Sequence, residues 1–564
     1  MEFTYRKNDN SSLFSSVVNP DGMNVTDPQN YVPLYRKFFS LSEKNYDTIN
    51  LNNVKHLESV GNKKDTNIFE CKVVDKNGSI STKDVFFKYS PLLDPVKYMM
   101  GRYMINDENV MKLPKFDTNN GHAKIRDPNN SAYVDSFFTY LTSQLFHSHG
   151  FVHALDFYGS FLANKNEFKV NIADDVEYLN DSEFFHVNRS VLFEVDNSYA
   201  NGIFNFNTRK NKEKLKLEAL DGDNVLELSN IEDLAALDNI FVERKDEESD
   251  ENKEADLVFS FDIKEGNKKD EDSSSECSSR SSVTDGEEDS DGDDDDDSSE
   301  SGFSTVSEDM LFATIPCFPV QVIALEKCAN TLDSLIVEHG EDMKDLEWGS
   351  MMIQVIMMLH SYQKTYSLTH NDLHTNNIMY VPTDKPFLYY KADERYYKVP
   401  TFGRLYKIID FGRAIYKFRG NVICSDSYHP KGDAATQYNF EPYMNEEKPR
   451  LEPNFSFDLC RLGCSLLDFF MDELEESPKD PKLAAKRVMA EWCMDDKGRN
   501  VLYKKDGEER YPNFKLYKMI ARTVHNHLPI DELRKGYFER FVVSRKKLSK
   551  NVKIMNIDEL PSYM

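Results

Sequence analysis

The sequence predicts an α+β fold, in which a strand-rich part and a helix-rich part share one chain. Two β-favouring runs, residues 67–75 and 83–90, are joined by Lys76-Asn77-Gly78-Ser79, which is typical of a tight hairpin. Residues 132–147 and 348–362 carry apolar side chains at helical spacing. Strands and helices gathered in different parts of a chain are typical of the α+β class.

The negative charge of the chain belongs mainly to one segment. Residues 241–310 contain 27 acidic and 7 basic side chains, a balance of −20 within a total of −28. This segment lacks the apolar content to fold, so we expect it to be disordered and a candidate surface for basic partners. The rest of the chain has no obvious basic stripe, and we expect no direct nucleic-acid binding.

Composition favours an intracellular protein without a membrane span. The longest apolar run, residues 351–359, is interrupted by Gln354, and the N-terminus lacks the apolar core of a secretory signal. Eight cysteines without a Cys-x-x-Cys pair suggest neither a disulfide framework nor a zinc site.

Two short motifs carry residue types that phosphoryl transfer requires. Residues 370–378 read HNDLHTNNI, and residues 408–412 read IIDFG. Asp372 can orient and deprotonate an attacking hydroxyl, while Asn377 and Asp410 offer the hard oxygen ligands that Mg²⁺ prefers. These residues could instead cap helices or build turns. The order of the two motifs and their apolar flanks favour the chemical interpretation.

The two motifs together resemble the protein-kinase superfamily, whose pattern is H-x-D-L-x-x-x-N followed by D-F-G. The resemblance covers about residues 55–162 and 313–545. It implies a bilobal fold with a mainly antiparallel small lobe, a mostly helical large lobe, and ATP with Mg²⁺ between them.

The resemblance also implies roles in the small lobe. Lys88 follows an apolar strand, where the family places the lysine that contacts the nucleotide phosphates. The helix at 132–147 should offer an acid to Lys88, and Asp135 is the nearest candidate. Gly61 is the only glycine in the expected phosphate-covering loop, where the family has three.

The adenine is expected to meet the chain after the strand that begins near Cys317. Backbone groups around Glu326 to Cys328 would contact the base, with Leu325 behind it. In the large lobe, Asp458 matches the helix pattern D-x-x-x-x-G, whose acid braces the catalytic loop.

These expectations divide the chain into an irregular N-terminal extension, two pieces of a small lobe around a large insertion, a large lobe and a tail. The insertion is expected to contain a possible small subdomain followed by the acidic segment. The boundaries are 1–50, 51–162, 163–312, 313–330, 331–548 and 549–564.

Two further stretches narrow the resemblance. Residues 398–403 (KVPTFG) and 431–437 (KGDAATQ) resemble kinase-like proteins of large nucleocytoplasmic DNA viruses. This resemblance implies a viral serine/threonine kinase that acts on protein substrates in the infected-cell cytoplasm or is packaged in virions.

Several positions depart from the family pattern. Asn371 replaces the usual arginine before the catalytic aspartate, so we expect no requirement for an activation-segment phosphate. His374 stands where many serine/threonine kinases place a lysine. The A-P-E element is ambiguous between Glu441-Pro442 and Glu452-Pro453, and Arg522 is a candidate partner for its acid.

Two other functions remain open. The pattern H-x-D-L-H-x-x-N is similar to aminoglycoside- and choline-kinase-like enzymes, which phosphorylate small molecules. The expected phosphate-covering loop has one glycine instead of three, and the helix at 132–147 contains no glutamate. Both features are compatible with a pseudokinase that acts as a binding scaffold.

Overall fold

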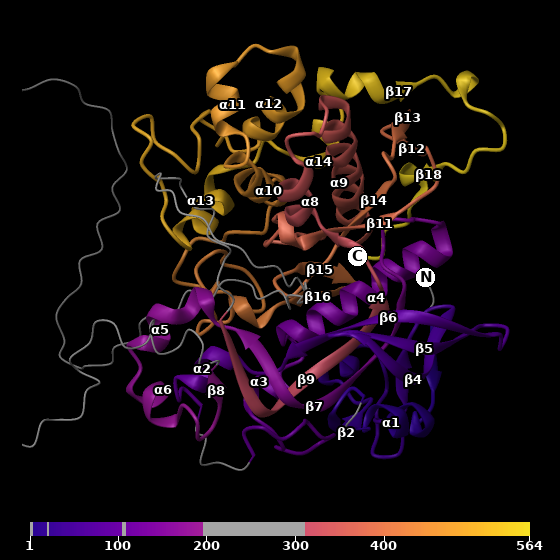
Figure 1. The fold of residues 1–564 in the computed structure, drawn as a ribbon, viewed down its shortest axis with the longest axis vertical. Coiled ribbons are helices and arrows are strands. Elements are labelled where there is room, and N and C mark those ends of the chain that lie inside the picture. The colour runs from indigo at the N-terminus through magenta and orange to yellow at the C-terminus, as the bar shows by residue number, and fades with distance from the viewer. Residues whose placement is uncertain (1–3, 20–21, 104–108, 196–310) are drawn as a thin grey trace, which may run out of the picture. The chain divides into compact units, whose positions relative to one another are not determined.

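The computed structural model describes residues 4–19, 22–103, 109–195 and 311–564 (Figure 1). Within these residues helices and strands are both abundant, so the predicted α+β class is confirmed. The acidic segment at 241–310 lies outside the described residues.

The largest sheet is antiparallel and has seven strands among the described residues. Its order is β2-β7-β9-β6-β5-β4, with β8 paired to β9. The predicted hairpin at residues 76–79 joins β5 to β6, and the Asp75 N–H donates to the Ser79 carbonyl across it. The strands are β2 (Val25–Gln29), β4 (Lys55–Asp65), β5 (Ile68–Asp75), β6 (Ile80–Pro91), β7 (Phe157–Asn171), β8 (Glu194–Val195) and β9 (Phe312–Glu326).

Helix α4 (Ser131–His149) lies between this sheet and the helical part of the chain (Figure 1). Asn130 caps its first turn, and Gly150 ends it with a positive φ of 69°. The Phe138 ring lies 5.7 Å from Tyr362 and 5.4 Å from Tyr366 of α9 (Asp345–Tyr366). One hydrophobic core therefore continues from the sheet through α4 to α9.

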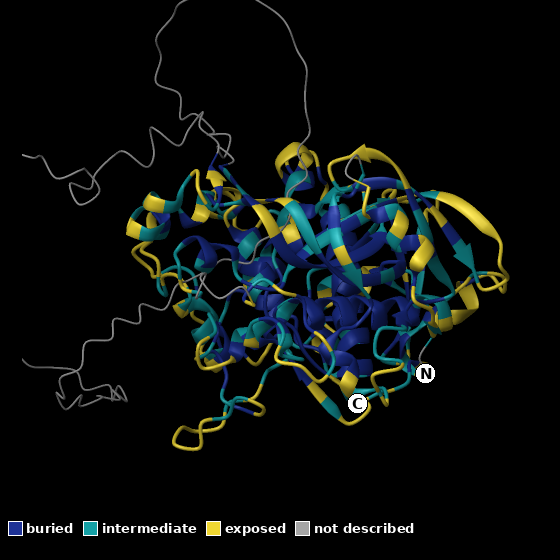
Figure 2. Ribbon diagram, turned by 90° about the horizontal axis from the view of Figure 1, so that it is seen from below, coloured by how far each residue is buried: buried dark blue, intermediate teal, exposed yellow. Residues whose placement is uncertain are grey.

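Around α9 lie shorter helices and small sheets, and Figure 2 shows that the buried residues (dark blue) include most of the inner helices. The remaining helices are α1 (Ser11–Val17), α2 (Pro95–Met99), α3 (Ala123–Arg126), α5 (Val176–Asn180), α6 (Glu183–Asn188), α8 (Leu332–His339), α10 (Phe457–Leu467), α11 (Met471–Glu476), α12 (Ala484–Glu491), α13 (Lys515–Thr523) and α14 (Pro529–Glu532). The remaining strands are β1 (Tyr5–Lys7), β3 (Ile49–Leu51), β10 (Asn330–Thr331), β11 (Ile378–Pro382), β12 (Phe387–Ala392), β13 (Arg395–Pro400), β14 (Arg404–Ile408), β15 (Ile415–Phe418), β16 (Asn421–Cys424), β17 (Val542–Val543) and β18 (Met555–Asn556).

The expectation of an irregular extension at residues 1–50 is wrong for its described part. β2 pairs with β7 at the edge of the large sheet, and β1 pairs with β3. Buried Asn10 donates hydrogen bonds to the side chains of Asn30 and Asn50, which ties the segment together. Because the helices and strands of this segment are only three to seven residues long, they are too short to show a clear apolar period in the sequence.

The large insertion begins later than residue 163. β7 continues to Asn171 and pairs along its length with β9, up to Asn171 opposite Phe312. The following residues form α5 and α6 and then return to the sheet as β8, so this described part joins the main sheet rather than a separate subdomain.

Residues 549–564 are an integral part of the fold rather than a tail. β18 pairs in parallel with β12, and buried Ile557 and Leu560 join the core. The Tyr563 N–H donates to the Thr365 carbonyl at 2.9 Å.

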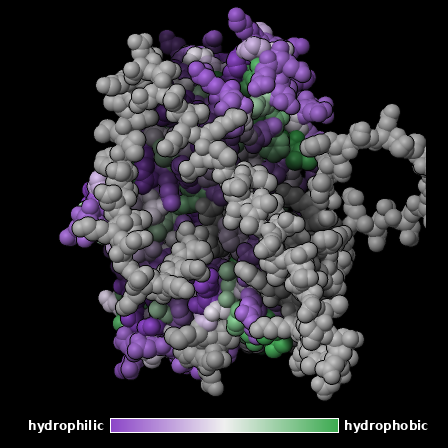
Figure 3. All heavy atoms as spheres, turned by 90° about the vertical axis from the view of Figure 1, so that its left-hand side faces the viewer, coloured by the Kyte–Doolittle hydropathy of each residue, from purple (hydrophilic) through white to green (hydrophobic). Residues whose placement is uncertain are grey.

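Among the described residues, none of the helices combines the length and apolar character needed to cross a bilayer. The face drawn in Figure 3 is mainly hydrophilic where described atoms are visible, with small hydrophobic areas between them.

Candidate active site

Three charged side chains from separate elements meet at one point. Lys88 lies on β6, Asp135 lies on α4, and Asp410 lies two residues after the end of β14. The Lys88 Nζ is 2.9 Å from Asp135 Oδ2 and 3.1 Å from Asp410 Oδ1. Burial disfavours the ammonium, but the two carboxylates outweigh it and raise the pKa of Lys88 above its ordinary value. Lys88 is therefore a stable positive charge, and its predicted pairing with Asp135 is present.

Asp135 uses its second oxygen to hold the neighbouring motif. Its Oδ1 accepts a hydrogen bond from the Phe411 N–H at 2.8 Å, and the Phe411 ring lies 4.6 Å from Phe138. The position of Asp410 is thereby fixed relative to α4. Asp410 also has a positive φ of 62°, a strained conformation that functional sites often contain.

Asp458 braces the loop at 370–378 in the expected way. Its two carboxylate oxygens accept hydrogen bonds from the N–H groups of His370 (2.9 Å) and Asn371 (2.8 Å), and its side chain is fully buried on α10. Asn371 adopts a positive φ of 66° and accepts a hydrogen bond from the Tyr438 hydroxyl. Asn371 stands where the motif was expected to have an arginine, and it is held there by an uncharged partner, the Tyr438 hydroxyl.

The Asp372 carboxylate is buried among cations and a phenol. The Tyr517 hydroxyl of α13 donates to Asp372 Oδ1 at 2.8 Å, and Arg413 Nε lies 3.9 Å from Oδ2. Arg413 also pairs with Asp433. A carboxylate held this way has a fixed orientation, which a general base requires.

The side-chain nitrogen of Asn377 makes its contacts within the loop at 370–378. This nitrogen donates to the Asp372 carbonyl at 2.8 Å and lies 3.0 Å from His374 Nε2. The amide oxygen is thus the atom suited to bind a cation. Burial lowers the pKa of His374, so its imidazole is neutral at pH 7.

The donor set fits Mg²⁺ that is shared with a polyphosphate. Asp410 and Asn377 supply one carboxylate and one amide oxygen, and the described residues hold no group of three His, Cys, Asp or Glu side chains able to bind a metal. Mg²⁺ commonly takes one or two protein ligands and completes its octahedron with phosphate oxygens and water.

The predicted base-binding residues lie at the end of β9. Leu325 pairs with Phe86 and Glu326 with Val85 of β6. The Glu326 carboxylate accepts hydrogen bonds from Lys407 Nζ (2.6 Å) and the Asp156 N–H, so this side chain is held in the protein. Cys328 is partly exposed two residues further on.

Phe86 lies next to this end of β9. Alternate residues of a strand point to the same face, so Phe86 and Lys88 share one side of β6. Phe86 is half-buried and lies opposite Leu325 in the ladder. A phenyl ring therefore stands where the family pattern V-A-I-K has the small side chain of alanine.

Gly61 lies inside β4, not in a loop over the phosphates. A Cβ on this residue would approach the Glu70 carbonyl oxygen to 2.8 Å, so the close passage of β4 and β5 requires glycine. The register of the two strands shifts here, between Val60 and Lys63. Gly61 therefore has a structural reason to be glycine, and its expected role in nucleotide binding stays a prediction.

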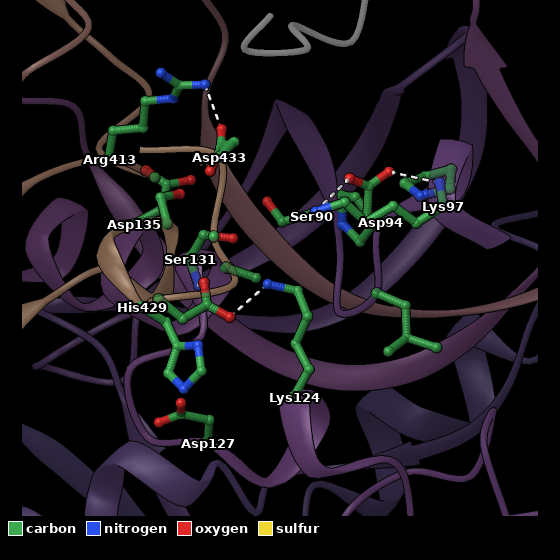
Figure 4. Close-up of a pocket in the computed structure, with 18 of the residues that line it drawn as sticks. Ser90, Asp94, Lys97, Lys124, Asp127, Ser131, Asp135, Arg413, His429 and Asp433 are labelled. Carbon is green, nitrogen blue, oxygen red and sulfur yellow. Dashed lines mark hydrogen bonds and ion pairs between the residues drawn. The ribbon is translucent and has the colours of Figure 1, made fainter. Parts of the chain in front are cut away.

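A cavity of about 670 Å³ opens beside the charged residues. Its lining includes Lys88, Asp135, Asp372, Asp410 and Arg413. In Figure 4, Asp135 of α4 lies near Arg413 and Asp433 of the segment after residue 410, while Ser90, Asp94 and Lys97 lie on the other side of the view. Lys124 is directed at the Asp426 carboxylate. The lining does not include Gly61, Leu325, Glu326, Cys328 or Asn377, so the cavity adjoins the charged residues and does not reach the end of β9.

Arg522 is not the partner of either candidate A-P-E glutamate. It donates to the carbonyls of Thr436 (2.8 Å) and Gln437 (3.3 Å). Arg450 instead pairs with both Glu441 and Glu452 on the surface. The arginine that pairs with the two glutamates, Arg450, is thus close to them in the sequence, whereas the expected partner, Arg522, is far from them.

Sequence reasoning missed three residues that contact or surround Asp372: Arg413, Arg461 and Tyr517. Arg413 directly follows the D-F-G motif and could have been suspected from that position. Tyr517 is 145 residues from Asp372 in the chain, and no local pattern marks it.

Comparison with known proteins adds no assignment. No protein-family model matches the chain, and no curated protein matches it.

Proposed function

We propose that this chain is an ATP-dependent phosphotransferase of the protein-kinase type that acts on serine and threonine hydroxyls of proteins. The observation that carries the proposal is the meeting of Lys88, Asp135 and Asp410. They lie beside the loop at 370–378, whose backbone N–H groups donate to Asp458. Four motifs that are far apart in the chain thereby share one site. Such convergence is hard to explain by turns and caps alone.

Each residue has a role in this proposal. Lys88 would orient the nucleotide phosphates, and Asp410 and Asn377 would hold Mg²⁺, which neutralises charge on the phosphates when bound. Asp372 would accept the proton of the acceptor hydroxyl as its oxygen bonds to the γ-phosphorus and ADP leaves. His370 supports the loop, since its Nε2 lies 2.9 Å from the Ile409 carbonyl oxygen.

The fold supports this proposal at a coarser level. An antiparallel sheet with α4 would form the small lobe, the chain after β9 would form the hinge, and α8 to α14 would form the large lobe. The viral resemblance of residues 398–403 and 431–437 extends the proposal to a virus-encoded kinase of the infected-cell cytoplasm or virion.

Phe86 favours a second candidate, a kinase-like scaffold with weak or no catalysis. Its ring lies on the face of β6 that Lys88 shares, where it would restrict space for a base, and the cavity lining does not include Leu325, Glu326 or Cys328. In this case the protein would act by binding partners.

A transfer assay tests the proposal. Purified protein is incubated with Mg²⁺ and γ-labelled ATP, with protein acceptors in one arm and a metabolite panel in the other. Label on proteins supports the proposal, whereas label on metabolites alone assigns a small-molecule phosphotransferase.

Two variants connect the activity to the site. Asp372→Asn and Lys88→Met should each lower transfer by about 10² to 10⁴-fold, because they remove the base and the phosphate contact. Lys72→Met, on the exposed face of β5, is the matched control and should transfer like the wild type. A transfer rate unchanged by Asp372→Asn would refute the assigned base.

A further inference from the structure

The hydroxyl group nearest to the proposed base belongs to the chain itself. Tyr517 Oη donates to Asp372 Oδ1 at 2.8 Å, which is the contact that an acceptor hydroxyl must make with a general base. The third residue of α13 thus occupies the acceptor side of Asp372.

Several contacts hold Tyr517 in this position. Arg461 Nε donates to Tyr517 Oη at 2.9 Å, and the Tyr517 ring stacks on Phe514 with centroids 5.3 Å apart. The Arg413 guanidinium lies 5.7 Å from the centroid of the Tyr517 ring. The contacts to its hydroxyl and to its ring therefore fix the orientation of the Tyr517 side chain next to Asp372.

We infer that Tyr517 is a modification site of this protein, phosphorylated intramolecularly by the chain's own active site. The inference rests on the proposed function. In the reaction, Tyr517 Oη bonds to the γ-phosphorus of ATP, the bond from this phosphorus to the β,γ-bridging oxygen breaks, and ADP leaves. The phenolic proton passes to Asp372.

The surroundings suit this reaction. Burial and the Asp372 charge raise the pKa of Tyr517, so the phenol is protonated and needs a base to react. Arg461 donates to the oxygen that would carry the phosphoryl group, and the Arg413 guanidinium lies 5.7 Å from the centroid of the same ring. An acceptor already held at the base needs no recognition pocket, so a tyrosine can react in a site that otherwise selects serine or threonine.

The consequence is a change in the acceptor site. A phosphate on Tyr517 adds close to two negative charges beside the Asp372 carboxylate. Repulsion between them would move the Tyr517 side chain away from Asp372, leaving this face of the base open to an external hydroxyl.

Mass spectrometry of the full chain tests the inference. Protein treated with phosphatase is incubated with Mg²⁺-ATP and cleaved after acidic residues, since trypsin would cut at both Lys515 and Lys518. Cleavage after Glu509 and before residue 532 yields one peptide with Tyr511 and Tyr517, and its fragment ions separate them. Tyr511 is the internal control, because its hydroxyl makes no hydrogen bond to the described residues.

We expect up to one phosphate per chain at Tyr517, with a rate constant independent of protein concentration over a 100-fold range. Asp372→Asn and Tyr517→Phe should abolish the modification, and Tyr511→Phe should leave it intact.

Three results would contradict the inference. If the wild type labels external proteins while Tyr517 stays unmodified, the inference fails and the proposed function stands. A rate constant proportional to protein concentration would show reaction between chains and refute the intramolecular assignment. If the wild type transfers phosphate to no acceptor at all, the proposed function fails together with the inference.

Discussion

Single side chains in this site have two tasks each. Asp135 pairs with Lys88 through one oxygen and holds the Phe411 N–H through the other. Asn377 holds the loop through its nitrogen and leaves its oxygen for a cation. Phe86 pairs with Leu325 in the β6–β9 ladder and lies on the same face of β6 as Lys88. The charged residues of the site are thus each held by more than one contact.

The role of Phe86 leads to a prediction about nucleotide binding. Phe86→Ala removes the ring from the face that Lys88 shares, so we expect ATP to bind about tenfold more tightly, a gain of about 1.4 kcal/mol. Isothermal titration with Mg²⁺-ATP measures the change. Phe86→Leu keeps most of the bulk and should bind ATP like the wild type. Weaker binding by Phe86→Ala would instead mean that the ring contacts the base.

The sequence predicted the residues of the site better than their contacts. Asp372, Asn377 and Asp410 lie in short motifs whose spacing is local, and the structure brings Asp410 to Lys88. The sequence did not show that Gly61 lies where two strands pass closely, because a glycine required by close strands looks the same in a sequence as one in a phosphate-binding loop. Tyr517 could not be found, since its contact with Asp372 depends on how α13 packs against the rest of the fold.

At the level of secondary-structure elements, long periodic segments were predictable and short ones were not. The helices at 131–149 and 345–366 and the hairpin between β5 and β6 agree with their sequence patterns. Strands of two or three residues, such as β1, β3 and β18, carry no detectable alternation. Their pairing is decided by distant partners, which a local pattern does not contain.

The contact between Asp458 of α10 and the loop at 370–378 can be tested by mutation. Asp458→Asn keeps the shape of the side chain but replaces one acceptor oxygen by a donor, which leaves the N–H of His370 or Asn371 without a partner in a buried site. We expect a loss of about 1–3 kcal/mol in the free energy of unfolding. Urea denaturation measures it.

The matched control is Asp472→Asn on α11, where the side chain is exposed. This variant should change the free energy of unfolding by less than about 0.5 kcal/mol. Equal stability of the two variants would show that the Asp458 contacts do not brace the loop.

At the scale of the whole molecule, the ends of the described chain close the fold. The N-terminal strand β2 extends the large sheet, while the last residues join the helical part. The Arg419 N–H donates to the Tyr563 carbonyl at 2.7 Å, so the C-terminal residues also contact the segment that follows Asp410. Residues outside the motifs thus support the site at a distance.

The C-terminal contacts predict a stability effect far from the site. Ile557 is fully buried, and its carbonyl accepts a hydrogen bond from Lys364 Nζ at 3.0 Å. Ile557→Ala removes buried methyl groups and leaves a cavity, so it should lower the free energy of unfolding by about 2–5 kcal/mol. Chemical denaturation followed by fluorescence measures this loss. Lys550→Ala, at an exposed position seven residues earlier, should cost less than about 0.5 kcal/mol. If both variants are as stable as the wild type, residues 549–564 are a dispensable tail after all, and the packing of Ile557 contributes nothing to the core.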